Sequence, residues 1–269
     1  MPEPNRYTQI IERLFLSHYK KGDTEVPFER EDIVRVAHDL GVRLPKNLGD
    51  VIYSFRYRTP LPKSVTRRAP KGHQWVIRSS GRALYKFVAT KTVKILPSSM
   101  LAETKIPDAT PGVIAMYALG DEQALLAKVR YNRLIDIFTG VACYSLQSHL
   151  RTSVQGMGQV ETDEVYVGVD RRGVHYVFPV QAKAGRDILS IVQIEQDLAM
   201  CAERFPSLMC RPVGAQFMAL DLICLFAFEA ADTGVAIVHE KHYRLVPPDQ
   251  LSTAELEAYR TREEKGPCD

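Results

Sequence analysis

The chain has 269 residues, of which 45% are apolar and 9% aromatic, a composition that predicts a folded protein with one large domain or two ordinary ones. The apolar-leaning run at 218–231 is too short to span a bilayer and the first residues lack the apolar core of a signal peptide, so we expect a cytoplasmic protein without membrane contact. Five cysteines, an odd number without a Cys-x-x-Cys pair, argue against both a disulfide framework and a cysteine zinc site.

The net charge is only +3, but the charges are unevenly distributed along the chain. Residues 1–100 contain 19 Lys or Arg and nine Asp or Glu, whereas the remaining 169 residues contain 16 and 23. Residues 51–102 contain 11 basic residues and no acid at all. A positive segment in an otherwise acidic chain favours a polyanionic partner, with nucleic acid first.

Three amphipathic helices are predicted near the N-terminus, because apolar residues recur every three or four positions over residues 7–20, 29–40 and 46–56. A loop rich in Arg and Lys should follow, and then a strand over residues 74–78 around the single Trp. Three helices followed by strands and a basic loop resemble a winged helix-turn-helix, in which the third helix enters the DNA major groove.

That resemblance implies that the third helix and the basic loop contact DNA, mostly through phosphates that supply affinity rather than sequence information. The expected DNA-binding residues are Asn47, Ser54, Arg56, Arg58, Lys63, Arg67, Arg68 and Lys71. The alternative is a solvated basic loop on a helical domain that binds protein. A run of 52 residues without one acid is hard to ascribe to solubility alone, and it favours nucleic acid.

Prolines and glycine at 96–99 and 105–112 predict a linker. The expected organisation is a winged-helix-like domain at 1–98, a linker at 99–112 and a second domain at 113–269. In the second domain Asp121 should cap a helix over 122–138, and residues 141–150 should form a strand.

Residues 159–185 predict a β-hairpin, in which two β-rich runs flank the turn Arg171-Arg172-Gly173. A three-residue loop ending in Gly pairs Asp170 with Val174. The same register sets Asp163 opposite Gln181 and Glu161 opposite Lys183, on one face of the hairpin.

These polar groups share their face with Val165, Val167, Val169 and Val177, which we expect to point to the core. Burying them requires a compensating partner, and a divalent cation held by acid and amide oxygens is one. Pro179 cannot donate to a sheet ladder, so it predicts a bulge or an unpaired side.

The acid Asp163 on one strand and Gln181-Ala182-Lys183 at the end of the next resemble the active-site hairpin of the PD-(D/E)XK nuclease superfamily. Gln181 stands where that family usually has an acid, and Thr162 stands where it usually has Pro. The resemblance covers residues 121–205 and implies an α/β domain with a mixed central sheet flanked by helices.

The resemblance to this nuclease superfamily also implies roles for individual residues. Asp163, Gln181 and Lys183 would be catalytic, with Mg²⁺, or Mn²⁺ in its place, held by Asp163, Gln181 and the carbonyl of Ala182. Glu161, Gln193 and Glu122 would be auxiliary. Two alternatives stay open: Gln193 as a surface residue, and Glu122 as an acid that merely favours the helix dipole.

Beyond the hairpin, a helix is predicted at 187–204 and strands at 213–218, 223–228 and 235–238, completing the sheet. Ser252 and Glu255 form a capping-box pattern that should open a C-terminal helix. His239 and His242 could suggest a metal, but they form a two-residue gap at a strand end without a third ligand, and we interpret them as incidental.

The expected function is therefore an Mg²⁺-dependent endonuclease of the type II restriction class, which would cut double-stranded DNA as a homodimer because two strands require two sites. One alternative is a non-catalytic winged-helix DNA-binding regulator whose nuclease fold has lost its metal site. Another is that the hairpin is plain structure, with Lys183 reaching solvent.

Overall fold

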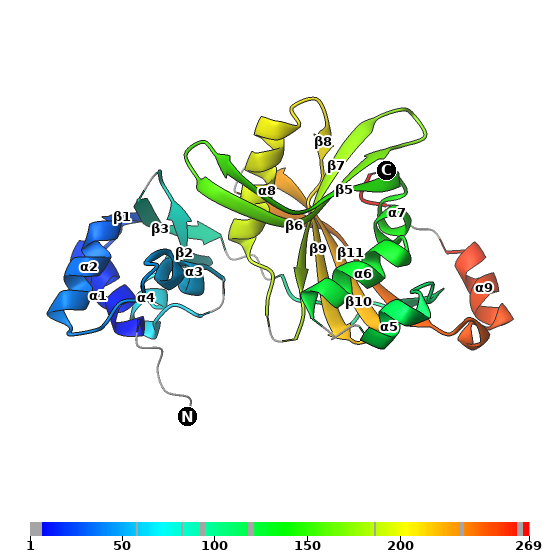
Figure 1. Cartoon of the computed structure of the whole chain (residues 1–269), viewed down its shortest axis with the longest axis horizontal. Coiled ribbons are helices and arrows are strands. Elements are labelled where there is room, and N and C mark those ends of the chain that lie inside the picture. Colours follow the sequence, from blue (N-terminus) through cyan, green and yellow to red (C-terminus); the bar gives the residue numbers. More distant parts are fainter. Residues whose placement is uncertain are drawn as a thin grey trace. The chain divides into compact units, whose positions relative to one another are not determined.

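The computed structural model describes residues 7–57, 59–81, 83–91, 95–117, 121–185, 187–231, 234–262 and 266–268 (Figure 1). The chain divides into two compact units. One comprises Met1–Lys94 with Ser153–Val160, and the other comprises Ile95–Thr152 with Glu161–Asp269.

The first unit combines helices with an antiparallel sheet ordered β1-β3-β2. Its elements are α1 (Thr8–His18), β1 (Glu25–Glu29), α2 (Arg30–Asp39), α3 (Gly49–Tyr57), α4 (Lys63–Thr66), β2 (His73–Ser79) and β3 (Leu84–Lys91). The three predicted helices are confirmed. Strand β1 was not predicted, and the basic segment expected as a loop begins with the short helix α4.

Aromatic side chains form the centre of this unit. The Phe15 ring meets Trp75 and Phe87 edge-on, with centroids 5.0 and 5.1 Å apart, and all three side chains are buried. Edge-to-face pairs add to the free energy that burial of large rings contributes. The helical stripe of α1 and the strands of the sheet are therefore joined by one apolar cluster.

The second unit is a mixed α/β structure, with a curled sheet flanked by helices (Figure 1). Its helices are α5 (Gly112–Tyr117), α6 (Glu122–Tyr131), α7 (Leu134–Thr139), α8 (Ile191–Arg204) and α9 (Thr253–Arg260). Its strands are β4 (Glu103–Pro107), β5 (Ala142–Val154), β6 (Gly158–Val169), β7 (His175–Lys183), β8 (Met209–Cys210), β9 (Val213–Ala219), β10 (Leu222–Ala231) and β11 (Gly234–Val246). The sheet order is β4-β11-β10-β9-β7-β6-β5, and β8 pairs with β7.

Strand β7 runs parallel to β9 and antiparallel to β6, and it is buried along nearly its whole length. Helix α6 packs on β7 and β9, whereas α8 packs on β7, β8 and β11. The two helices contribute to opposite faces: Leu125 of α6 clusters with Phe178, while Asp197 of α8 bonds Gln181. Alternating residues of β7 therefore meet different helices.

The hairpin register is the predicted one from Val169–His175 to Glu164–Val180, without a shift at Pro179. On the other side of β7, β8 pairs with Tyr176 and Val177 and β9 pairs from Val180 onward. Pro179 therefore lies where the neighbouring ladder is interrupted, which avoids losing a strand hydrogen bond. The sequence predicted either a bulge or an unpaired side at Pro179, and the structure shows the unpaired side.

The expected core face of the hairpin was only partly right. Val165 and Val177 are fully buried, but Val169 is 37% exposed. The large apolar cluster lies on the opposite face, around Tyr166 and Phe178, because α6 and α7 cover that side. Both faces of β7 are covered, so alternation alone does not identify the core side.

The helix predicted over 122–138 is two helices, α6 and α7. Arg133 between them has a φ of 50°, a left-handed conformation that a helix interior does not accommodate. The preceding Asn132 accepts the backbone N–H of Ala109 and donates to Asp108. These tertiary hydrogen bonds stop the first helix at a point where the sequence continues to favour helix.

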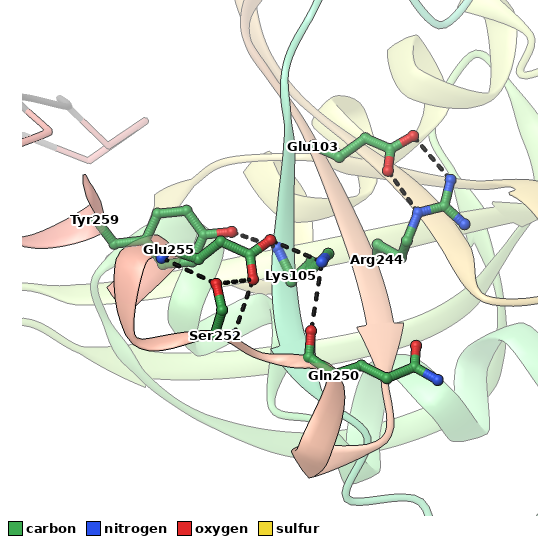
Figure 2. Close-up of polar contacts among 7 residues, drawn as sticks. All are labelled: Glu103, Lys105, Arg244, Gln250, Ser252, Glu255 and Tyr259. Carbon is green, nitrogen blue, oxygen red and sulfur yellow. Dashed lines mark hydrogen bonds and ion pairs between the residues drawn. The ribbon is translucent and has the colours of Figure 1, made fainter. Parts of the chain in front are cut away.

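Residues 99–112, expected as a linker, contain strand β4, which pairs in parallel with β11 at the edge of the sheet. Figure 2 shows the polar contacts that surround it. Arg244 of β11 binds both carboxylate oxygens of Glu103, and Lys105 binds Glu255 of α9 at 2.7 Å. The predicted capping box of Ser252 and Glu255 is confirmed.

No helix within the described residues is long and apolar enough to cross a membrane.

Candidate active site

The C-terminal end of β7 and the facing part of β6 bring the predicted site residues together. Asp163 accepts the backbone N–H of Ala182 at 2.8 Å through Oδ2. Burial raises the pKa of this carboxyl above its ordinary value, and the nearby Glu122 and Glu161 add to the shift. The Ala182 hydrogen bond and the ammonium of Lys183 act in the opposite direction. Asp163 is therefore an acid in a crowded anionic setting.

Lys183 is buried, and its ammonium lies 3.0 Å from Oε1 of Glu122, the first residue of α6. The two residues are 61 positions apart in the chain, so the sheet and the helix must pack together to form this pair. A buried ammonium requires such a partner. Glu122 thus contacts a predicted site residue, in addition to standing in the first turn of α6.

Gln181 is fully buried, and its amide is held at both ends. The nitrogen donates to both carboxylate oxygens of Asp197 at 3.1 Å and to the carbonyl of Glu161 at 3.1 Å. The oxygen accepts from Nε2 of Gln193 at 3.0 Å. Gln193 is thus bonded to the predicted site, and the amide oxygen of Gln181 keeps one further lone pair.

Asp197 was not predicted from the sequence as a site residue. This residue of α8 is almost wholly inaccessible to solvent, and burial raises its pKa to about 8. Thr162 donates to it at 2.6 Å in addition to Gln181. A signal existed in the sequence, since Asp197 stands between Ile194 and Cys201 in the buried stripe of an amphipathic helix. An acid in such a stripe predicts a buried polar contact.

A second group of residues, at the rim of the site, was also not predicted. Arg151 and His149 of β5 lie 3.0 and 3.8 Å from the carboxylate of Glu161, and His149 contacts Gln123, next to Glu122, at 3.0 Å. His149 has a φ of 49° within a strand. Left-handed backbone at a residue other than Gly costs free energy and clusters at functional sites.

The residues expected to bind DNA lie in the first unit. Lys63, Arg67, Arg68 and Lys71 are exposed at and after α4, as a phosphate-binding segment requires. Asn47 is exposed too, but its side chain bonds Asp50 and the N–H of Gly49 at the start of α3.

The remaining positions are less exposed. Ser54 is half-buried and bonds Thr59 at 2.8 Å, and the Arg56 guanidinium lies 5.1 Å from the Tyr57 ring centroid. Arg58 lies outside the described residues.

The chain matches no known family model and no curated protein sequence. The nuclease resemblance of the hairpin consequently depends on its residues and their geometry.

The residues present fit a hard divalent cation. The carboxylates of Asp163, Glu161 and Glu122 outnumber the cations Lys183 and Arg151 beside them, and carboxylate and amide oxygens are the ligands that Mg²⁺ prefers. In an extended strand the N–H and C=O of one residue face the same neighbour. Because the N–H of Ala182 binds Asp163, its carbonyl points to the same side.

Proposed function

We propose that this protein is an Mg²⁺-dependent endonuclease that hydrolyses double-stranded DNA. The observation that carries the proposal is the meeting of Asp163, Lys183 and Glu122 at the end of the hairpin and the start of α6. A buried lysine beside an acid of raised pKa is an arrangement common at catalytic sites. These groups come from three separate chain segments, α6, β6 and β7. Their meeting therefore does not result from a chance pattern within one short stretch of sequence.

Asp163, Gln181 and the Ala182 carbonyl would hold the ion, with Glu161 beside them. When bound, Mg²⁺ supplies a Lewis acid for the scissile phosphate and lowers the pKa of a bound water. Lys183 orients the attacking water and offsets negative charge that develops on the phosphate. Glu122 orients the Lys183 ammonium, and Gln193 orients the Gln181 amide.

The first unit would bind the DNA as a winged helix. Its element order, α1-β1-α2-α3-α4-β2-β3, supports this assignment, as does the sheet order β1-β3-β2. The exposed basic residues after Pro62 would contact phosphates. A restriction enzyme of type II that cuts both strands would act as a homodimer.

A specific observation favours a second candidate, a DNA-binding regulator without catalysis. The Gln181 amide is occupied by Asp197, Glu161 and Gln193, which is how a degenerate site would be filled. This candidate predicts DNA binding by the same first unit and no cleavage under any metal condition.

Cleavage assays separate the two candidates. Purified protein is incubated with plasmid and genomic DNA, methylated and unmethylated, with Mg²⁺, Mn²⁺ or EDTA. The nuclease proposal expects metal-dependent fragments that disappear in Asp163→Asn, which keeps an oxygen for the Ala182 N–H, and in Lys183→Met. Glu257→Ala, an exposed acid of α9, serves as the matched control and should cut normally. Cleavage by Asp163→Asn at the normal rate would refute the site.

A further inference from the structure

Three metal-ligating side chains, those of Cys224, Glu240 and His242, converge on the face of β10 and β11 that also carries Phe226. Cys224 of β10 pairs directly with His242 of β11, and Glu240 pairs with Phe226. Residues two apart on a strand share a face, so the three side chains point the same way. The sequence analysis interpreted His242 as incidental, and the structure corrects this: Glu240 lies two residues before it on the same face, and Cys224 comes from the adjacent strand.

The distances between the ligand atoms suit a small ion. The cysteine sulfur, the imidazole nitrogen and the carboxylate oxygen all lie within 4.8 Å of one another. Oε1 of Glu240 is 3.7 Å from Cys224 Sγ and 2.8 Å from His242 Nε2. Around tetrahedral Zn²⁺ the corresponding separations are about 3.3–3.6 Å, from bond lengths near 2.0–2.3 Å. The separation between Glu240 and Cys224 is already close to this range, whereas that between Glu240 and His242 would have to lengthen by about 0.5 Å.

The cysteine and the histidine of this cluster are buried, unlike the exposed acidic groups that commonly gather on a protein surface. Cys224 is 0% exposed and His242 2%. One oxygen of Glu240 receives Cys224, His242 and also the backbone N–H of Ser98, at 2.7 Å. Three donors around a single carboxylate oxygen crowd it, whereas an ion would bind the sulfur, nitrogen and oxygen directly.

A separate observation concerns the neighbouring strand. Gln216 of β9 is the register partner of Cys224 on the other side of β10, which puts both on one sheet face roughly 5 Å apart at Cβ. Its Oε1 is buried and has no hydrogen-bond partner among the described residues. A buried acceptor without a donor is rare and costs free energy. An ion or its bound water in the fourth position would satisfy it.

We propose that Cys224, Glu240 and His242 bind one Zn²⁺ ion, with Gln216 facing the fourth coordination position. Thiolate and imidazole favour Zn²⁺ over the hard Mg²⁺, and the cysteine thiol releases its proton when the ion binds. The site shares no ligand with the candidate active site. Register places Gln216 between Lys183 and Cys224, so β9 separates the two sites within the sheet.

Such an ion would be structural. It would join β10 to β11 and, through Glu240, to the chain at Ser98. A metal that binds only the folded state raises stability in proportion to the logarithm of its concentration. Removing zinc should therefore lower the melting temperature of the second unit by several degrees, whether or not the protein cuts DNA.

The test uses the untagged full chain. Elemental analysis after extensive dialysis should find one equivalent of zinc, and Co²⁺ added to metal-free protein should produce the near-ultraviolet absorption of a thiolate-to-cobalt bond. Cys224→Ser keeps a hydrogen-bond donor to Glu240 but removes the sulfur, so it should lose the cobalt band and the thermal response to zinc. Cys210→Ser is the matched cysteine control and should keep both.

Asp163→Asn should retain zinc in full, which separates failure here from failure of the proposed nuclease site. Wild-type protein without zinc, without a cobalt–thiolate band and with equal melting temperatures in zinc and in chelator would overturn the proposal. So would Cys224→Ser and His242→Gln that bind zinc like the wild type. The wild-type spectrum decides the question even where a variant fails to fold.

Discussion

The Gln181 amide allows a test of whether its role is structural, metal-binding or both. Gln181→Leu keeps comparable bulk but removes the donor to Asp197 and the acceptor for Gln193, both of which remain buried or half-buried. A buried polar group left unsatisfied costs about 1–3 kcal/mol. Two such groups, less a small gain from the apolar side chain, predict a loss of about 2–4 kcal/mol in the free energy of unfolding. In a unit of this size that corresponds to a fall of roughly 5–15 °C in melting temperature.

The assay is urea and thermal denaturation in EDTA, which removes any contribution from bound metal. Gln216→Leu is the control, because its Oε1 accepts no hydrogen bond among the described residues and the change should cost less than about 1 kcal/mol. Equal midpoints for Gln181→Leu and wild type would refute the hydrogen-bond network under the site. Below its melting temperature Gln181→Leu should still fail to cut DNA, since no oxygen replaces the ligand.

The basic segment, a buried thiol and an ion pair of α9 give three further predictions. In Asp163→Asn protein, replacing Arg67, Arg68 and Lys71 together by Ala should reduce the slope of log K for duplex DNA binding against log salt concentration by about 2–3. The control Arg260→Ala should leave the slope unchanged. An unaltered slope in the triple variant would assign the basic segment to another role. Burial raises the pKa of Cys143 to about 12, so native protein at pH 8 should not be alkylated there while unfolded protein is, as mass spectrometry would show; rapid native labelling would contradict its burial. Lys105 and Ser252 lower the pKa of Glu255 to about 2 from an ordinary 4.5, so this contact stabilises α9 above about pH 4.5 and is lost as the pH falls toward 2. In Lys105→Met the pKa measured by NMR should return toward its ordinary value, and an unmoved pKa would rule out the ion pair of Figure 2.

Local features were determined by the sequence itself. The spacing of apolar residues located α1, α2 and α3, and the capping pattern of Ser252 and Glu255 located the start of α9. The hairpin register followed from the turn ending in Gly173, which has a φ of 82°. Such features depend on residues within a few positions of one another, so helix geometry, turn geometry and strand alternation suffice to predict them.

Other features depended on contacts between distant segments. Parallel pairing with β11 turns a segment predicted as a linker into β4, and hydrogen bonds from Asn132 to residues 108–110 divide the helix predicted at 122–138. The choice of core face on the hairpin depended on where α6 and α7 pack. No local pattern contains this information, because the competing conformations differ little in propensity and the tertiary contacts select between them.

The candidate site divides in the same way. Strand alternation and the tight turn suffice to place Asp163, Gln181 and Lys183 on one face of the hairpin. Glu122 reaches Lys183 and Asp197 reaches Gln181 only because α6 and α8 pack against β7, and Cys224 meets His242 only because β10 and β11 pair. Strand order and helix packing are decided by burial of apolar surface over the whole unit, a non-directional effect that no short stretch of sequence encodes.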